Sequence, residues 1–178
     1  MRILVVYGSA LGATRGIAER VAATIGSAGL EVDVRSVAES PPVAGYDGFV
    51  VGSAVHAGHW LPEAATFVRA NRRSLADHPT WLFSSGPVGD QYVTREGPDP
   101  AEIDEFRSWI APRDHRVFAR AHDRSSAQTE RLGAVTRFVA RRLIPNGDWR
   151  DWPAIEAWAT GIVRDLTGAA RPLVTSGR

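Results

Sequence analysis

The stretch VVYGSALGATRGIAERV, residues 5–21, decides the fold. Its apolar start extends the run RILVVYG, which is typical of a strand buried on both faces of a parallel sheet. Gly8 ends that run, and from Thr14 onward apolar residues recur four positions apart, which predicts a helix. A strand that passes through a loop of small residues directly into a helix predicts the first unit of a parallel α/β sheet.

The rest of the chain repeats this alternation. Four further strands are predicted in LEVDVRSV (30–37), YDGFVVGSAV (46–55), TWLFSSG (80–86) and HRVFARA (115–121). Helices are predicted from Pro62 to about Leu75, over 100–111, and from Pro153 onward. We therefore predict one α/β domain over residues 1–168. Its core is a doubly wound, five-stranded parallel sheet in the order 2-1-3-4-5, and residues 169–178 are expected to be a disordered tail.

One segment does not fit the simple alternation. Residues 124–143 predict an extra helix with an apolar stripe, in a region where residues 107–150 carry 10 Arg against 4 Asp or Glu. Three interpretations stay open for this Arg-rich segment: contact with an anionic membrane surface, contact with substrate carboxylates, or a solvated helix face.

Composition excludes several kinds of chemistry. The 178 residues contain no Cys, and all 21 basic residues are Arg, so disulfides, thiolate nucleophiles and lysine Schiff bases are excluded. No apolar run reaches the roughly 20 residues of a membrane span, and no signal peptide is recognisable. We expect a cytoplasmic protein with no nucleic-acid partner, and peripheral contact with the inner face of the membrane through the Arg-rich segment remains an alternative.

The loop after the first strand lies where parallel α/β sheets bind ligands. Its small residues and the N–H groups of the following helical turn favour a phosphate. A triphosphate loop needs a Lys that this chain lacks, and Gly8, Gly12 and Gly16 do not have the dinucleotide spacing. A single phosphomonoester therefore remains.

That loop resembles the phosphate loop of flavodoxins, Ser/Thr-x-Thr-Gly-x-Thr. Ser9, Gly12 and Thr14 match the pattern, whereas Leu11 replaces a Thr and Ala13 a common Asn. By this resemblance the phosphate site comprises Ser9, Ala10, Leu11, Gly12, Ala13 and Thr14.

Two further loops extend the resemblance to nearly the whole chain. One follows the third predicted strand and comprises Ala54, Val55, His56, Ala57, Gly58, His59 and Trp60. The other follows the fourth and comprises Ser84, Ser85, Gly86, Pro87, Val88 and Gly89. The Gly-His-Trp sequence at 58–60, the Arg-rich segment 124–143 and Asp151-Trp152 resemble the flavodoxin-domain family that includes menaquinone-dependent protoporphyrinogen oxidase.

The resemblance implies a flavodoxin-like fold that binds FMN, with the two further loops flanking the isoalloxazine ring. It also implies an oxidoreductase that passes electrons from a reduced small-molecule donor through FMN to a quinone. A one-electron carrier, or a protein that binds another flavin-like ligand such as a deazaflavin, remain alternatives. No catalytic residue can be assigned.

Individual loop residues keep alternative interpretations. His56 and His59 lack an evident third ligand, so no metal site is expected. Trp60 either stacks on a flat ring or packs against the following helix.

Overall fold

The computed structural model describes residues 1–10, 12–86, 99–119, 121–122 and 147–168. The predicted Arg-rich helix over 124–143 and the predicted tail over 169–178 lie outside these residues, as do Leu11, Pro87, Val88 and Gly89. Among the helices of the described part, none is both long and apolar enough to cross a membrane.

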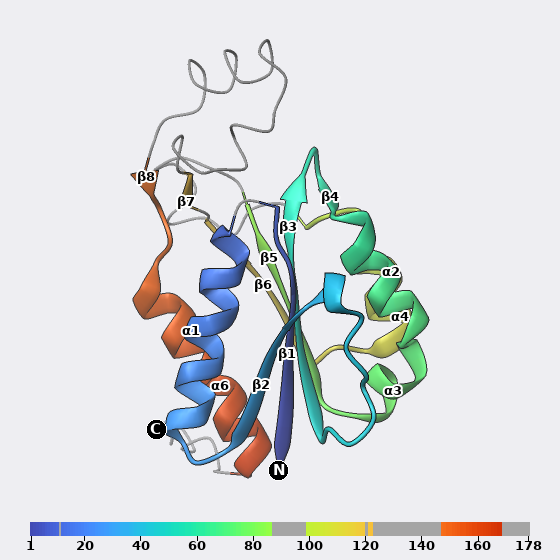
Figure 1. Cartoon of the computed structure of the whole chain (residues 1–178), viewed down its shortest axis with the longest axis vertical. Helices are drawn as coiled ribbons and strands as arrows, with labels where there is room; N and C mark the ends of the chain where they lie inside the picture. Colours follow the sequence, from blue (N-terminus) through green and yellow to red (C-terminus); the bar gives the residue numbers. More distant parts are fainter. Residues whose placement is uncertain (11, 87–98, 120, 123–146, 169–178) are drawn as a thin grey trace, which may run out of the picture.

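A parallel sheet forms the centre of the molecule (Figure 1). Its strands are β1 (Arg2–Gly8), β2 (Glu31–Ser36), β3 (Gly48–His56), β5 (Thr80–Ser85) and β6 (Asp114–Phe118). Their spatial order is β2-β1-β3-β5-β6, and each neighbouring pair is parallel. The predicted fold class and order of the five main strands are therefore confirmed.

Short strands of two residues lie around the carboxyl ends of this sheet. β4 (His59–Trp60) folds back on β3 as an antiparallel hairpin. β7 (Ala121–His122) pairs with β8 (Gly147–Asp148), and Ala121 is the last residue of the predicted fifth strand, whereas β8 was not predicted. Two-residue strands carry no detectable periodicity, so only tertiary pairing reveals them.

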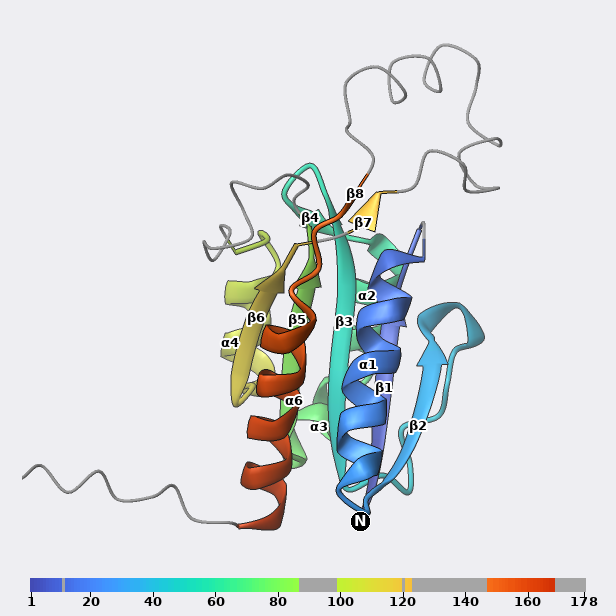
Figure 2. The same ribbon diagram turned by 90° about the vertical axis from the view of Figure 1, so that its left-hand side faces the viewer.

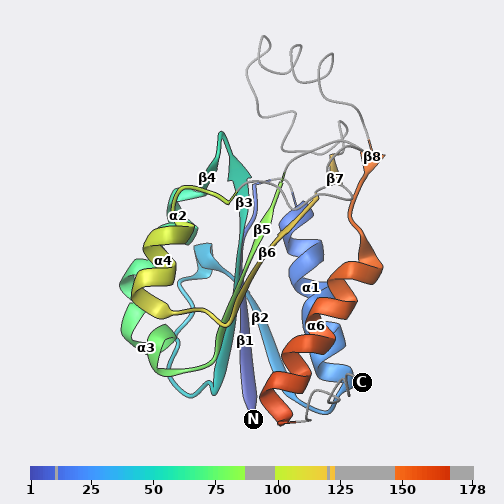
Figure 3. The ribbon, with the colours of Figure 1, turned by 180° about the vertical axis from the view of Figure 1, so that it is seen from behind.

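Helices cover both faces of the sheet (Figures 2 and 3). α1 (Ala13–Ser27) and α6 (Trp152–Thr167) lie side by side on one face. The other face carries α2 (Pro62–Ala70), α3 (Arg72–Asp77) and α4 (Ile103–Ile110), and the short 3₁₀ turn η1 (Val37–Glu39) follows β2.

The single helix predicted from Pro62 to Leu75 is wrong in one respect, because the chain breaks it at Asn71. The Asn71 side-chain amide donates to the Phe67 carbonyl over 2.9 Å, beside the backbone N–H of Asn71, which bonds the same oxygen. An Asn side chain that bonds nearby backbone competes with helix continuation. α2 therefore ends before Asn71 and α3 begins after it.

The sheet separates two apolar clusters. Leu4, Val51, Trp60, Leu82 and Phe106 represent the cluster under α2, α3 and α4. Ile3, Ile17, Trp81, Phe83 and Ile162 represent the cluster under α1 and α6. Both faces of the central strands are thus buried, as the continuous apolar runs predict.

Candidate functional site

The N-terminus of α1 lies at the carboxyl end of β1. Gly12 occupies the cap position with φ +84°, a backbone conformation that costs a residue with a side chain about 1–2 kcal/mol. The Gly12 N–H donates to Ser9 Oγ over 3.0 Å, so the Ser9 hydroxyl proton is directed elsewhere. No acidic residue lies in the first turn of α1, and no side chain caps it. This helix end therefore keeps the positive potential that attracts an anion.

The loop after β3 is a tight hairpin. Ala57 and Gly58 both have positive φ, 51° and 82°, which is the two-residue turn that matches the twist of paired strands. His56 and His59 face each other across it as strand partners, and both are exposed. The hairpin presents two imidazoles at the carboxyl edge of the sheet.

Residues from the start of α4 hold this hairpin in place. The Ala101 N–H donates to the Gly58 carbonyl over 3.0 Å. Glu102 accepts the Trp60 backbone N–H at Oε2 and contacts His59 Nδ1 at Oε1, both over 2.9 Å. Burial opposes ionisation of Glu102, but the hydrogen bonds from Trp60 and His59 outweigh it, and the pKa of Glu102 lies below its ordinary value.

A buried chain of hydrogen bonds runs beneath the hairpin. Trp60 Nε1 donates to Ser84 Oγ over 2.8 Å, and Ser84 Oγ lies 2.8 Å from His115 Nε2. His115 Nδ1 contacts Asp99 Oδ1 at 3.0 Å, and Asp99 also pairs with Arg107.

Burial lowers the pKa of His115, although Asp99 opposes that shift, so the ring is neutral. Its Nδ1–H then donates to Asp99, and Nε2 accepts the Ser84 hydroxyl proton. The network therefore runs in one direction from Trp60 to Asp99.

The end of β5 contributes two hydroxyls, one to each face of the sheet. Ser84 belongs to the network, whereas Ser85 Oγ is a buried polar atom that has no hydrogen-bond partner in the described structure. The Gly86 N–H continues the sheet by bonding the Phe118 carbonyl over 3.0 Å. An orphaned buried hydroxyl at a strand end indicates a place where a ligand or water completes the site.

The structure brings the described parts of the three predicted loops together. They follow β1, β3 and β5, which are neighbours in the sheet, and Gly8 is the strand partner of Ser53 while Ala54 is the partner of Ser85. Trp60 is 2% exposed and packs edge-on against Phe106 with ring centroids 5.3 Å apart, an environment that fits the packing alternative. Thr14 is buried, whereas Ala10 and Gly12 are exposed.

Sequence reasoning missed Glu102, His115 and Asp99. Glu102 lies in the region predicted as a helix, and its contacts with His59 and Trp60 span 43 and 42 residues of chain. His115 begins a predicted strand, where a buried neutral His has no local sequence signature.

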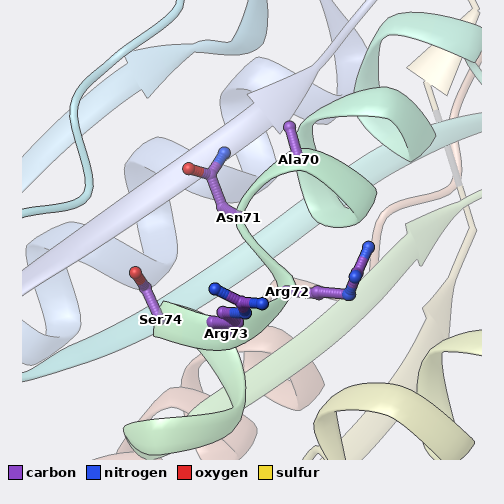
Figure 4. Close-up of a pocket in the computed structure, with 5 residues that line it drawn as sticks. All are labelled: Ala70, Asn71, Arg72, Arg73 and Ser74. Atoms are coloured by element: carbon purple, nitrogen blue, oxygen red, sulfur yellow. The ribbon is translucent and has the colours of Figure 1, made fainter.

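A surface hollow of about 360 Å³ lies elsewhere, at the junction of α2 and α3 (Figure 4). Its lining residues are Ala70, Asn71, Arg72, Arg73 and Ser74. The two helices meet toward the opposite end of the sheet from β4 (Figure 1), so this hollow is separate from the three loops. Among the described side chains, no group of three or more is arranged to hold a metal ion.

The fold is a doubly wound α/β domain, and its loops gather outside the carboxyl ends of the strands, where such domains bind ligands. The model of the flavodoxin domain family matches residues 4–141, and the chain belongs to that family. Members of this family bind FMN, in agreement with the expected cofactor.

Curated relatives include protoporphyrinogen IX dehydrogenase [quinone] of Escherichia coli K12, which is 29% identical over 86 residues. The match spans 47% of this chain and about half, 48%, of that relative.

Solved structures support the same fold. A flavodoxin from the domain Archaea superposes with a TM-score of 0.61 at 16% identity, over 94% of this chain and 99% of that chain. Rubredoxin oxygen:oxidoreductase of Desulfovibrio gigas gives 0.60 at 14% identity, over 94% of this chain and 36% of that one. Flavodoxin 1 from Bacillus cereus gives 0.57 at 14% identity, over 92% of this chain and 98% of that chain.

The site residues fit FMN on the structure's own terms. The uncapped α1 terminus with Gly12 and Ser9 suits a phosphate, since it offers backbone N–H donors and no negative charge. The unpartnered Ser85 hydroxyl lies at the end of β5, where the resemblance places the far side of the ring.

Proposed function

We propose that this protein is an FMN-binding oxidoreductase that passes electrons from a reduced organic donor through FMN to a quinone. The observation that carries the proposal is the gathering of the three loops after β1, β3 and β5 around an uncapped helix N-terminus. The curated relative named protoporphyrinogen IX dehydrogenase [quinone] suggests protoporphyrinogen IX as the donor and a quinone as the acceptor.

Each part of the site has a distinct task in this proposal. The N–H groups of the first turn of α1, together with Ser9 and Thr14, hold the phosphate. The hairpin at 56–60 and the end of β5 at 84–86 flank the isoalloxazine ring. Bound flavin supplies the capacity to take two electrons from an organic donor and release them to an acceptor, and the protein supplies position and electrostatics.

A one-electron carrier is the second candidate. The archaeal flavodoxin matches over 99% of its length, which favours it. The pI of about 8.3 disfavours it, because a carrier that docks on basic reductases needs an acidic surface. A redox titration that shows two well-separated one-electron steps would favour the carrier over the oxidoreductase.

A quinone acceptor requires access to a membrane surface. We propose that the Arg-rich segment 124–143 supplies peripheral contact with anionic lipid. Flotation with vesicles that contain anionic lipid tests this at low and high salt. Binding that is lost at high salt supports the contact, and no binding at low salt refutes it.

The function itself is tested in two stages. FMN is first titrated into apoprotein, and binding with a micromolar Kd or tighter, about −8 kcal/mol, is expected. Protoporphyrinogen IX is then added to the flavin-loaded protein without oxygen, followed by menadione. Bleaching of the flavin absorbance by the donor and its return with the quinone support the oxidoreductase. A flavin that stays oxidised with the donor refutes this reaction, and a protein that binds no FMN refutes the proposal as a whole.

A further inference from the structure

At the hairpin, the carboxylate of Glu102 contacts the exposed imidazole of His59 over 2.9 Å. The Glu102 side chain is 13% exposed and the His59 side chain 63%, so a mostly buried carboxylate holds a ring that faces outward. Glu102 has no freedom to turn away, because its other oxygen accepts the Trp60 N–H. The carboxylate is therefore fixed by the fold and independent of any ligand.

That arrangement determines which nitrogen of His59 carries the proton in the neutral ring. A carboxylate accepts hydrogen bonds and cannot donate one when ionised, and the lowered pKa of Glu102 keeps it ionised at neutral pH. Nδ1 must then bear the hydrogen that Glu102 accepts. Nε2 is left with its lone pair, on an exposed ring beside the loops proposed to flank the flavin.

We propose that His59 Nε2 is the proton acceptor when the organic donor is oxidised, and that Glu102 is the positioning residue that sets the His59 tautomer. This inference rests on the proposed function, because it assigns a role within that reaction. In a two-electron oxidation step of the donor, an N–H bond breaks and its proton passes to His59 Nε2. A donor C–H bond breaks at the same time and a new π bond forms in the donor, and bound FMN would be the oxidant that accepts the hydride.

The groups around His59 bear on the proposed proton-acceptor role of His59 and the positioning role of Glu102. Glu102 at the start of α4 contacts His59, and His56 on β3 is its strand partner. Asp99, the next carboxylate along, is engaged by His115 and Arg107. A single carboxylate, Glu102, therefore orients the His59 imidazole, as in other carboxylate–histidine pairs in which the carboxylate orients a catalytic base.

A single isosteric substitution tests the assignment. In Glu102→Gln the one carbonyl oxygen accepts the Trp60 N–H, and the amide NH₂ group faces His59 Nδ1. That nitrogen must then accept a hydrogen bond, so the neutral ring changes to the Nε2–H tautomer while the fold is kept. Glu105→Gln is the matched control, since Glu105 lies one turn further along α4 and pairs with Arg69 on the surface.

Two readouts separate the outcomes. Long-range ¹H–¹⁵N NMR of the imidazoles, on protein without donor, is expected to show His59 as Nδ1–H in the wild type and in Glu105→Gln, and as Nε2–H in Glu102→Gln. Anaerobic flavin reduction by protoporphyrinogen IX is expected to slow by about 10²-fold or more in Glu102→Gln, the usual scale of proton-transfer catalysis, with little change in FMN Kd.

An Nε2–H ring in the wild type would overturn the role of Glu102. A changed tautomer with an unchanged reduction rate would overturn the role of His59 as proton acceptor. If the proposed function itself fails, the wild type binds no FMN or its flavin is not reduced by the donor. The proton-acceptor role of His59 is then refuted as well. NMR still decides independently whether Glu102 sets the His59 tautomer.

Discussion

The indole Nε1 of Trp60 donates a hydrogen bond to the buried hydroxyl of Ser84 over 2.8 Å. This bond joins the hairpin after β3 to the carboxyl end of β5, two of the three segments that gather at the site. The same Ser84 oxygen faces His115, so one hydroxyl connects an aromatic anchor on one loop with a neutral imidazole on β6.

The Trp60→Phe variant is expected to lower the free energy of unfolding by about 1–3 kcal/mol, because it leaves the buried Ser84 oxygen short of a donor. Urea denaturation measures this. Trp109→Phe on α4 is the matched control, since Trp109 is 42% exposed and its loss should change stability by less than about 0.5 kcal/mol. Equal effects for the two variants would show that the Trp60–Ser84 bond contributes nothing particular.

The Gly12→Ala variant is expected to raise the FMN Kd by about tenfold or more, since strain of about 1–2 kcal/mol at the cap distorts the N–H donors of α1. Gly29→Ala provides the control, because Gly29 has the same φ of +84° and equally open surroundings but lies beyond the other end of α1. Both variants should lose similar stability, and only Gly12→Ala should lose FMN affinity, measured by fluorescence titration. An unchanged FMN Kd in Gly12→Ala would show that the phosphate does not bind at this helix end.

The Gly16→Ala variant is expected to gain no stability, although alanine usually favours a helix interior. A Cβ at Gly16 would meet the Arg150 guanidinium, which pairs with Asp148 and lies over the Trp152 ring. Gly161→Ala in α6 has no such neighbour and should gain about 0.5–1 kcal/mol. Thermal unfolding of both variants compares them, and an equal gain in each would show that Arg150 does not need the space above Gly16.

Stability is expected to fall on acidification below pH 6.5, the ordinary pKa of a histidine, partly because of His115. Burial lowers the pKa of His115, so the unfolded chain binds a proton before the folded chain does. The contribution is therefore present above pH 6.5 and is lost as the pH falls from there toward the lower folded value. Denaturation of the wild type and His115→Gln across this range should show a smaller pH slope for the variant. NMR titration of His115 at or above pH 6.5 would contradict the prediction.

The fold, and the meeting of the three loops at one edge of the sheet, were predictable because they depend on local patterns. The apolar run before Gly8 and the helical spacing after Thr14 define β1, the loop and α1 without any distant contact. Once the strand order follows, the loops after β1, β3 and β5 must lie at one edge. For this reason a resemblance in three short motifs was enough to propose a candidate site at this edge.

The contacts that organise the site were not predictable, because they join distant parts of the chain. Nothing near Glu102 indicates that it reaches His59, and nothing near His115 indicates that Ser84 and Asp99 surround it. The break at Asn71 also escaped prediction, since the apolar stripe continues through it and only the side-chain bond to Phe67 ends the helix. Apolar periodicity predicts which face of an element is buried. It does not predict which polar side chain bonds a partner that is distant in sequence.

The division of the core by the sheet has a practical consequence for protein engineering. The polar network from Trp60 to Asp99 lies with the α2–α4 cluster, whereas the contacts between α1 and α6 belong to the other cluster. Free-energy changes at well-separated sites without shared partners are close to additive. Thermostability can thus be raised by repacking α6 against α1 without changing the geometry around His59. Kinetic measurements on such stabilised variants can then be compared directly with those on the wild type.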